Sequence, residues 1–62
     1  MTEREAAELL RDGIHEYAET YGTELRDTRT FAEDGVLTQN VGFTVRFWDR
    51  DDEFQVTIVK SR

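Results

Sequence analysis

Two groups of residues in this sequence combine types and spacing that could hold a metal ion. The first centres on His15, the single histidine, which has Asp12 three residues before it and Glu19 four residues after it. On a helix this spacing places all three on one face, where an imidazole and two carboxylates could share a divalent cation. Ligands from one helix have no surrounding residues to orient them. We therefore expect a solvated helix face and no metal site.

The second group is acidic and follows a tryptophan: Asp49, Asp51, Asp52 and Glu53. A calcium loop needs oxygen ligands spaced over about twelve residues, a glycine near its middle and a distal bidentate glutamate. This stretch has no glycine and lies between two runs of alternating apolar residues. Because aspartate side chains accept hydrogen bonds from turn amides, we interpret residues 49–52 as a four-residue hairpin loop, or residues 50–51 as a tighter one.

Covalent catalysis and cofactor binding find little support. The chain has no cysteine and one histidine, which excludes cysteine nucleophiles, thiolate zinc sites and multi-histidine metal sites within one chain. The four glycines are isolated and form neither a dinucleotide-binding turn nor a phosphate loop. We expect no catalytic, cofactor-binding or metal-binding residues, no small-molecule substrate, and a protein that is not an enzyme.

Composition indicates one small acidic domain. The 62 residues include 14 Asp and Glu against 8 Lys and Arg, for a net charge of −6, and Lys60 is the single lysine. This acidic excess with scarce lysine resembles the small acidic proteins of halophilic archaea, which implies a cytoplasm rich in potassium salt, where charge repulsion is screened. The absence of cysteine also favours the cytoplasm. The first twenty residues contain six carboxylates and no apolar run, so we expect neither a signal peptide nor a membrane span.

A helix is predicted over residues 3–21. Thr2 and Glu5 have the spacing of a capping box, in which each side chain bonds the backbone amide of the other residue. Apolar residues then recur at steps of three and four, and Gly22 is a typical C-terminal cap. The apolar stripe comprises Ala7, Leu10, Ile14, Tyr17 and Tyr21.

After Gly22 the apolar period changes to two, which predicts strands over about 24–32, 36–48 and 53–60. For the last two strands, one antiparallel register pairs Phe47 with Phe54, Val45 with Val56 and Phe43 with Ile58.

For the first two strands, a register that pairs Phe31 with Leu37 and Leu25 with Phe43 leaves residues 33–35 as a three-residue loop. Such a loop places Gly35 in the left-handed conformation of a G1 bulge. A two-residue turn at Asp34 and Gly35 is the alternative.

These elements predict an α+β fold, with the helix on one face of a three-stranded antiparallel meander (α-β-β-β). The expected core consists of Leu10, Ile14, Tyr17, Tyr21, Leu25, Phe31, Leu37, Val41, Phe43, Val45, Phe47, Phe54, Val56 and Ile58. The opposite face of the sheet, which we expect to remain open, carries Arg26, Thr28, Thr30, Thr38, Asn40, Thr44, Arg46, Trp48, Gln55, Thr57 and Val59.

That open face predicts a small non-catalytic interaction module. The partner would be another protein or a second copy, bound through the open face or through an edge strand. The residues expected at the interface are Trp48, Arg46, Arg26, Thr44, Thr57 and Val59. Local packing of Trp48 against its own hairpin remains an alternative. A nucleic-acid-associated regulator using the same face is a second hypothesis, against which the net negative charge argues because phosphate contacts dominate such binding.

Overall fold

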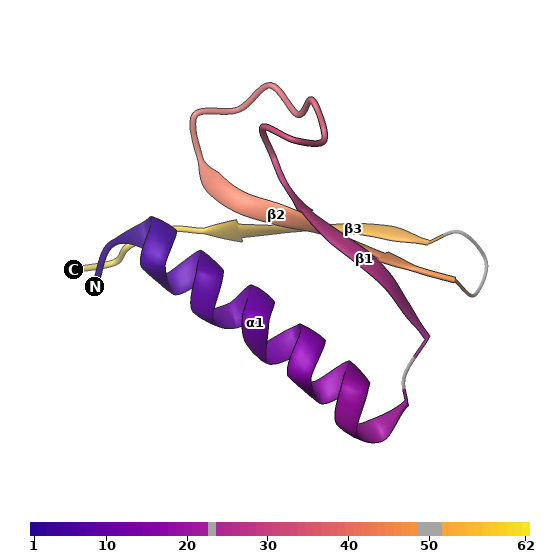
Figure 1. Cartoon of the computed structure of the whole chain (residues 1–62). Helices are drawn as coiled ribbons and strands as arrows, with labels where there is room; N and C mark the ends of the chain where they lie inside the picture. Colours follow the sequence, from indigo (N-terminus) through magenta and orange to yellow (C-terminus); the bar gives the residue numbers. More distant parts are fainter. Residues whose placement is uncertain (23, 49–51) are drawn as a thin grey trace.

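The computed structural model describes residues 1–22, 24–48 and 52–62, and in that part of the chain the predicted α+β fold is confirmed (Figure 1). Helix α1 spans Glu3–Tyr21, and strands β1, β2 and β3 span Leu25–Thr30, Val41–Phe47 and Glu53–Ile58. The strands form one antiparallel sheet in the order β1-β2-β3. The predicted hairpin loop at 49–52 lies outside the described residues except for Asp52. Among the described residues, no helix has the length and apolar character needed to cross a membrane.

Both ends of α1 form as local sequence signals predict. The Thr2 amide donates to Glu5 Oε1 at 3.0 Å, and the Glu5 amide donates to Thr2 Oγ1 at 3.1 Å, which completes the capping box. Gly22 ends the helix in the left-handed region at φ 66°, with its amide donating to the Ala18 carbonyl. Such caps satisfy backbone groups that a helix end leaves without partners.

The β2–β3 register differs from the predicted one by two residues. Val45 lies opposite Phe54, and Phe43 lies opposite Val56. A shift of two residues leaves every side chain on its predicted face, so the alternating pattern cannot distinguish the two registers. The observed register also brings Val41 opposite Ile58.

The strand predicted over 36–48 begins only at Val41, because residues 31–35 form a single helical turn. Thr30 and Glu33 form a second capping box, with amide-to-side-chain bonds of 3.0 and 3.1 Å. The turn closes when the Gly35 amide donates to Ala32 and the Val36 amide to Phe31, while Gly35 adopts φ 72°. This is the Schellman arrangement of a helix end. Gly35 is left-handed as predicted, but the three-residue hairpin loop is wrong.

Because Phe31 leaves the strand, β1 pairs with β2 in another register. Leu25 lies opposite Phe47 and Thr28 opposite Val45, with a bulge between Leu25 and Asp27. Thr28 and Thr30, which we placed on the face away from the helix, therefore share the face of Val45 and Phe43. Their predicted placement is wrong.

The sheet face opposite α1 is partly covered by the 31–40 segment, contrary to the expectation of an open face (Figure 1). The Phe31 ring lies so close to Gly42 that a Cβ there would stand 2.6 Å from Phe31 Cε2. Asp34 forms an ion pair with Arg46 on the same face. Thr44 lies between Gly42 and Arg46 along β2, and its exposed fraction is 0%. The fold therefore has packing on both faces of β2.

The core beneath α1 is smaller than predicted. Its buried apolar residues are Ala7, Phe43 and Val45, which are packed by the partly buried Ile14, Leu25, Val41, Phe47, Val56 and Ile58. Phe31 is buried, but on the other face of the sheet. Five residues that we expected in the core are exposed: Leu10, Tyr17, Tyr21, Leu37 and Phe54. Leu10 and Tyr17 line the groove described next, and Phe54 lies beside it against Phe47.

Candidate functional site

Polar contacts attach one flank of α1 to β1. Arg11 Nε donates to Thr28 Oγ1 at 2.7 Å, and Arg11 Nη2 donates to the Thr28 carbonyl at 2.8 Å. His15 Nε2 lies 2.6 Å from the same hydroxyl, and Thr28 is 5% exposed. Arg11 also lies 3.7 Å from Glu33 of the helical turn. These contacts satisfy a buried hydroxyl and hold the helix over the β1 side of the sheet.

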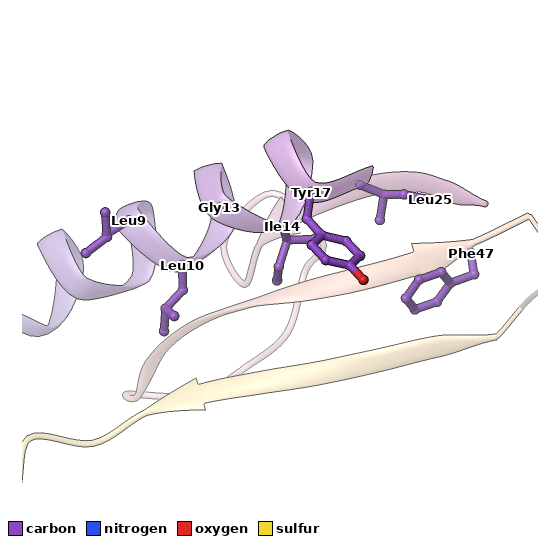
Figure 2. A pocket seen from close by; sticks show the side chains of 7 residues that line it. All are labelled: Leu9, Leu10, Gly13, Ile14, Tyr17, Leu25 and Phe47. Atoms are coloured by element: carbon purple, nitrogen blue, oxygen red, sulfur yellow. The ribbon is translucent and has the colours of Figure 1, made fainter. Parts of the chain in front are cut away.

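The opposite flank of α1 overhangs an apolar groove (Figure 2). Its volume is about 660 Å³. Figure 2 shows Leu10, Ile14 and Tyr17 projecting from α1 toward the strands, with Phe47 on β2 below them. The groove is lined by Leu9, Leu10, Gly13, Ile14, Tyr17, Leu25 and Phe47. None of these residues carries a charged side chain, so the groove is suited to apolar ligands or apolar protein surfaces.

The groove stays open because the apolar arc of α1 is wider than the surface that the sheet offers beneath it. Ala7 and Ile14 pack on β2, while Leu10 and Tyr17, on the flank of α1 away from the Arg11 and His15 contacts with β1, remain 49% and 59% exposed. On the sheet, the Phe47 and Phe54 rings meet edge to face at 5.9 Å. Phe54 is nevertheless 56% exposed. Exposed aromatic and aliphatic side chains gathered beside a groove are characteristic of an interaction site.

The residues predicted for an interface on the other face do not form one surface. Arg46 pairs with Asp34 and lies 3.6 Å from Glu53, and its side chain is only 21% exposed. Thr44 is buried, and its hydroxyl donates to the Arg29 carbonyl at 3.4 Å. Both residues therefore contribute to packing within the chain.

The other four predicted residues are exposed in two places. The Arg26 guanidinium carbon lies 5.0 Å from the centre of the Trp48 ring, and the Trp48 amide donates to the Glu24 carbonyl. The contact with Arg26 supports a partly local role for Trp48, although the ring remains largely exposed. Thr57 and Val59 lie on or just after β3, at the outer edge of the sheet.

No group of three or more metal-ligating side chains occurs within residues 1–22, 24–48 and 52–62. His15, Asp12 and Glu19 thus do not assemble a site there, and His15 Nε2 is directed at Thr28.

Among the described residues, two carboxylates with shifted pKa values are found, and both belong to caps of helical segments. Hydrogen bonds from the Thr2 and Thr30 backbone amides lower the pKa of Glu5 and Glu33, respectively. Neither carboxylate lines the groove, and both perturbations have a structural cause.

Sequence reasoning missed the groove because it assigned the whole apolar stripe of α1 to the core. A signal was present in β1, whose helix-facing positions are Leu25, Thr28 and Thr30 and contribute one large apolar side chain. Leu9 lies outside the stripe and widens the apolar arc. More apolar surface on the helix than on the strands beneath it indicates a second apolar partner.

Comparison with protein-family models, with curated proteins and with solved structures found no match to this chain.

Proposed function

We propose that this chain is a small non-catalytic interaction module that associates with a second copy of itself through the groove side of α1 and the neighbouring strand β3. The observation that carries the proposal is the groove of about 660 Å³, whose lining residues Leu10 and Tyr17 are half exposed, with the half-exposed Phe54 packed beside it on Phe47. Burial of such side chains is the main source of association free energy.

Charge distribution supports a second copy at this place. Each copy carries a net charge of −6, so most pairs of surfaces would repel. The groove lining is uncharged, and Asp12, His15 and Glu19 lie on the other side of the helix from Leu10 and Tyr17. Two copies can therefore meet here with Asp12 and Glu19 directed away, and concentrated salt would screen the remaining repulsion.

The size of the molecule permits such a contact. A stable interface buries about 800 Å² on each partner, which is about a sixth of the 5006 Å² accessible surface of this chain. A strand edge alone would not supply this area, but a strand edge together with the flank of a 19-residue helix can.

Sedimentation equilibrium over a range of protein and KCl concentrations tests the proposal. We expect a species of twice the chain mass, favoured by salt. Leu10→Ser should weaken the dimer about 30-fold, because half the burial of a leucine is worth about 1 kcal/mol and the change occurs in both copies. Leu37→Ser is the matched control, since Leu37 is 100% exposed on the 31–40 segment. Phe54→Ser tests the strand side of the same surface.

Two outcomes would contradict the proposal. A monomer at all concentrations and salts would remove self-association. Dissociation by Trp48→Ser with no effect of Leu10→Ser would move the interface to the Trp48 surface, as first expected from the sequence. The alternative of a nucleic-acid-associated regulator is tested by adding single-stranded RNA or DNA and following the Trp48 indole resonance, which we expect to stay unchanged.

A further inference from the structure

Strand β3 presents an outer edge suited to pairing with another strand. The Phe47 amide donates to the Asp52 carbonyl, so residues 47 and 52 form a hydrogen-bonded pair of the β2–β3 ladder. Because such pairs alternate with non-hydrogen-bonded pairs, Phe54, Val56 and Ile58 direct their backbone groups toward β2. The backbone groups of Gln55 and Thr57 then point outward. Within the described residues, no strand pairs with this edge.

The two edges of the sheet differ in how they are protected. The β1 edge has a bulge between Leu25 and Asp27 and carries an ion pair between Asp27 and Arg29. Bulges and charges are the usual means by which edge strands avoid pairing. Residues 54–58 of β3 contain no charge, no proline and no bulge in their pairing with β2. The β3 edge is therefore the better template for a partner strand.

Strand β3 is complementary to itself in one register. When two copies pair antiparallel about a twofold axis at Val56, Phe54 of each copy faces Ile58 of the other, and the two Val56 residues face each other. All apolar side chains on the helix side then meet apolar side chains. An axis at residue 55 would place Ile58 opposite Asp52, and an axis at residue 57 would place Phe54 opposite Lys60.

Charges at the ends of the strand favour the same register. With the axis at Val56, Lys60 of each copy faces Asp52 of the other. The dimer therefore contains two opposite-charge pairs, each formed by the single lysine of one copy. Both residues are exposed and available for such pairs. Hydrophobic pairing and charge complementarity thus select one register independently.

We propose that two copies join through antiparallel β3–β3 pairing centred on Val56, forming a six-stranded sheet with both helices on one face. This inference rests on the proposed self-association and specifies its geometry. The twofold axis brings the groove flanks of the two helices to face each other over the paired strands. The exposed Leu10, Tyr17 and Phe54 of each copy then have an apolar surface to pack against.

Single cysteines test the register, since the chain has no cysteine of its own. At a non-hydrogen-bonded pair the two Cα atoms are about 4.5 Å apart, within disulfide range. Val56→Cys should therefore form a covalent dimer under mild oxidation. Gln55→Cys and Thr57→Cys are matched controls, because in this register each residue is offset from its own copy by two positions, which separates the Cα atoms by more than about 7 Å.

Charge reversal provides a second test that leaves the core untouched. Lys60→Asp should weaken the dimer about 2- to 30-fold at low salt, given two exposed ion pairs per dimer, and adding Asp52→Lys restores both the ion pairs and the net charge of the wild type. The double variant should return to within about 2-fold of the wild type. The folded state of each variant is checked by its amide NMR spectrum.

The outcomes separate this inference from the proposed function. A wild-type monomer under all conditions overturns both. A wild-type dimer in which Gln55→Cys or Thr57→Cys forms the disulfide in place of Val56→Cys, or in which none of the three does, overturns the register but leaves self-association in place. A disulfide specific to Val56→Cys, with rescue in the charge-reversed double variant, supports the inference.

Discussion

Gly42→Ala should destabilise the protein strongly, because Gly42 lies where two other parts of the chain approach the β2 backbone. A Cβ at this position would overlap the Val56 carbonyl oxygen and stand 2.6 Å from Phe31 Cε2. The carbonyl belongs to the neighbouring strand and cannot move without disturbing the β2–β3 ladder. Overpacking of this kind costs about 1 to 3 kcal/mol, and we expect a loss of about 2 to 3 kcal/mol here.

This loss is large for a domain of this size. At about 0.05 to 0.15 kcal/mol per residue, a chain of 62 residues has a total stability of about 3 to 9 kcal/mol. Each kcal/mol shifts the Tm of a small domain by about 4 to 8 °C. Gly42→Ala should therefore lower the Tm by about 8 to 24 °C, measured by circular dichroism at fixed KCl concentration and checked by urea unfolding.

Gly13→Ala is the matched control, with the opposite sign. Gly13 lies inside α1, and a Cβ there meets no atom within 4 Å. Replacement of glycine by alanine within a helix is worth up to about 1 kcal/mol, so the Tm should rise by about 4 to 8 °C. If Gly42→Ala leaves the free energy of unfolding within about 0.5 kcal/mol of the wild type, Phe31 does not pack on Gly42 and the described cover of this face is wrong.

Three further predictions concern polar groups and salt. Hydrogen bonds from Thr30 lower the pKa of Glu33 in the folded state. The ionised Glu33 carboxylate therefore stabilises the fold fully above its unfolded pKa of about 4.3, and this stabilisation is lost as the pH falls through the lower pKa of the folded state. Glu33→Gln should therefore make stability less dependent on pH below about pH 5, as measured by urea unfolding; an unchanged pH profile would contradict this. Thr28→Val should cost about 1 to 2 kcal/mol, because Arg11 and His15 lose their shared hydroxyl partner; a neutral effect in thermal unfolding would show that water replaces it. Molar KCl should raise the urea midpoint by screening repulsion within a chain of net charge −6, and a midpoint equal to that at low salt would argue against a halophilic character.

The groove was not predicted from the sequence, because its residues look like core residues there. Leu10, Tyr17 and Phe54 follow the helical and strand periods that mark buried faces. Periodicity states which side of an element is apolar, but it does not state how much apolar surface the opposing layer offers. Here β1 contributes threonines to that layer, and Arg11 and His15 hold α1 over them.

The turn at residues 30–36 shows a different limit. Thr30 and Glu33 repeat the spacing of Thr2 and Glu5, so the signal for a helical turn was as strong locally as the one that correctly predicted α1. The alternation of Phe31 with Leu37 favoured a hairpin instead. Seven residues supply too few helical bonds to be stable alone. The packing of Phe31 on Gly42 and the Asp34–Arg46 ion pair are the contacts that stabilise the turn.

The ends of α1, the order of the elements and the face on which the apolar residues of β2 and β3 lie follow from local sequence, because capping and period-two alternation act over a few neighbouring residues. The strand registers, the cover over Gly42 and the groove under α1 arise from tertiary contacts. A register shift of two residues preserves every local pattern. Which register forms, and which apolar side chains are left for a second copy, therefore depends on contacts between residues far apart in the chain.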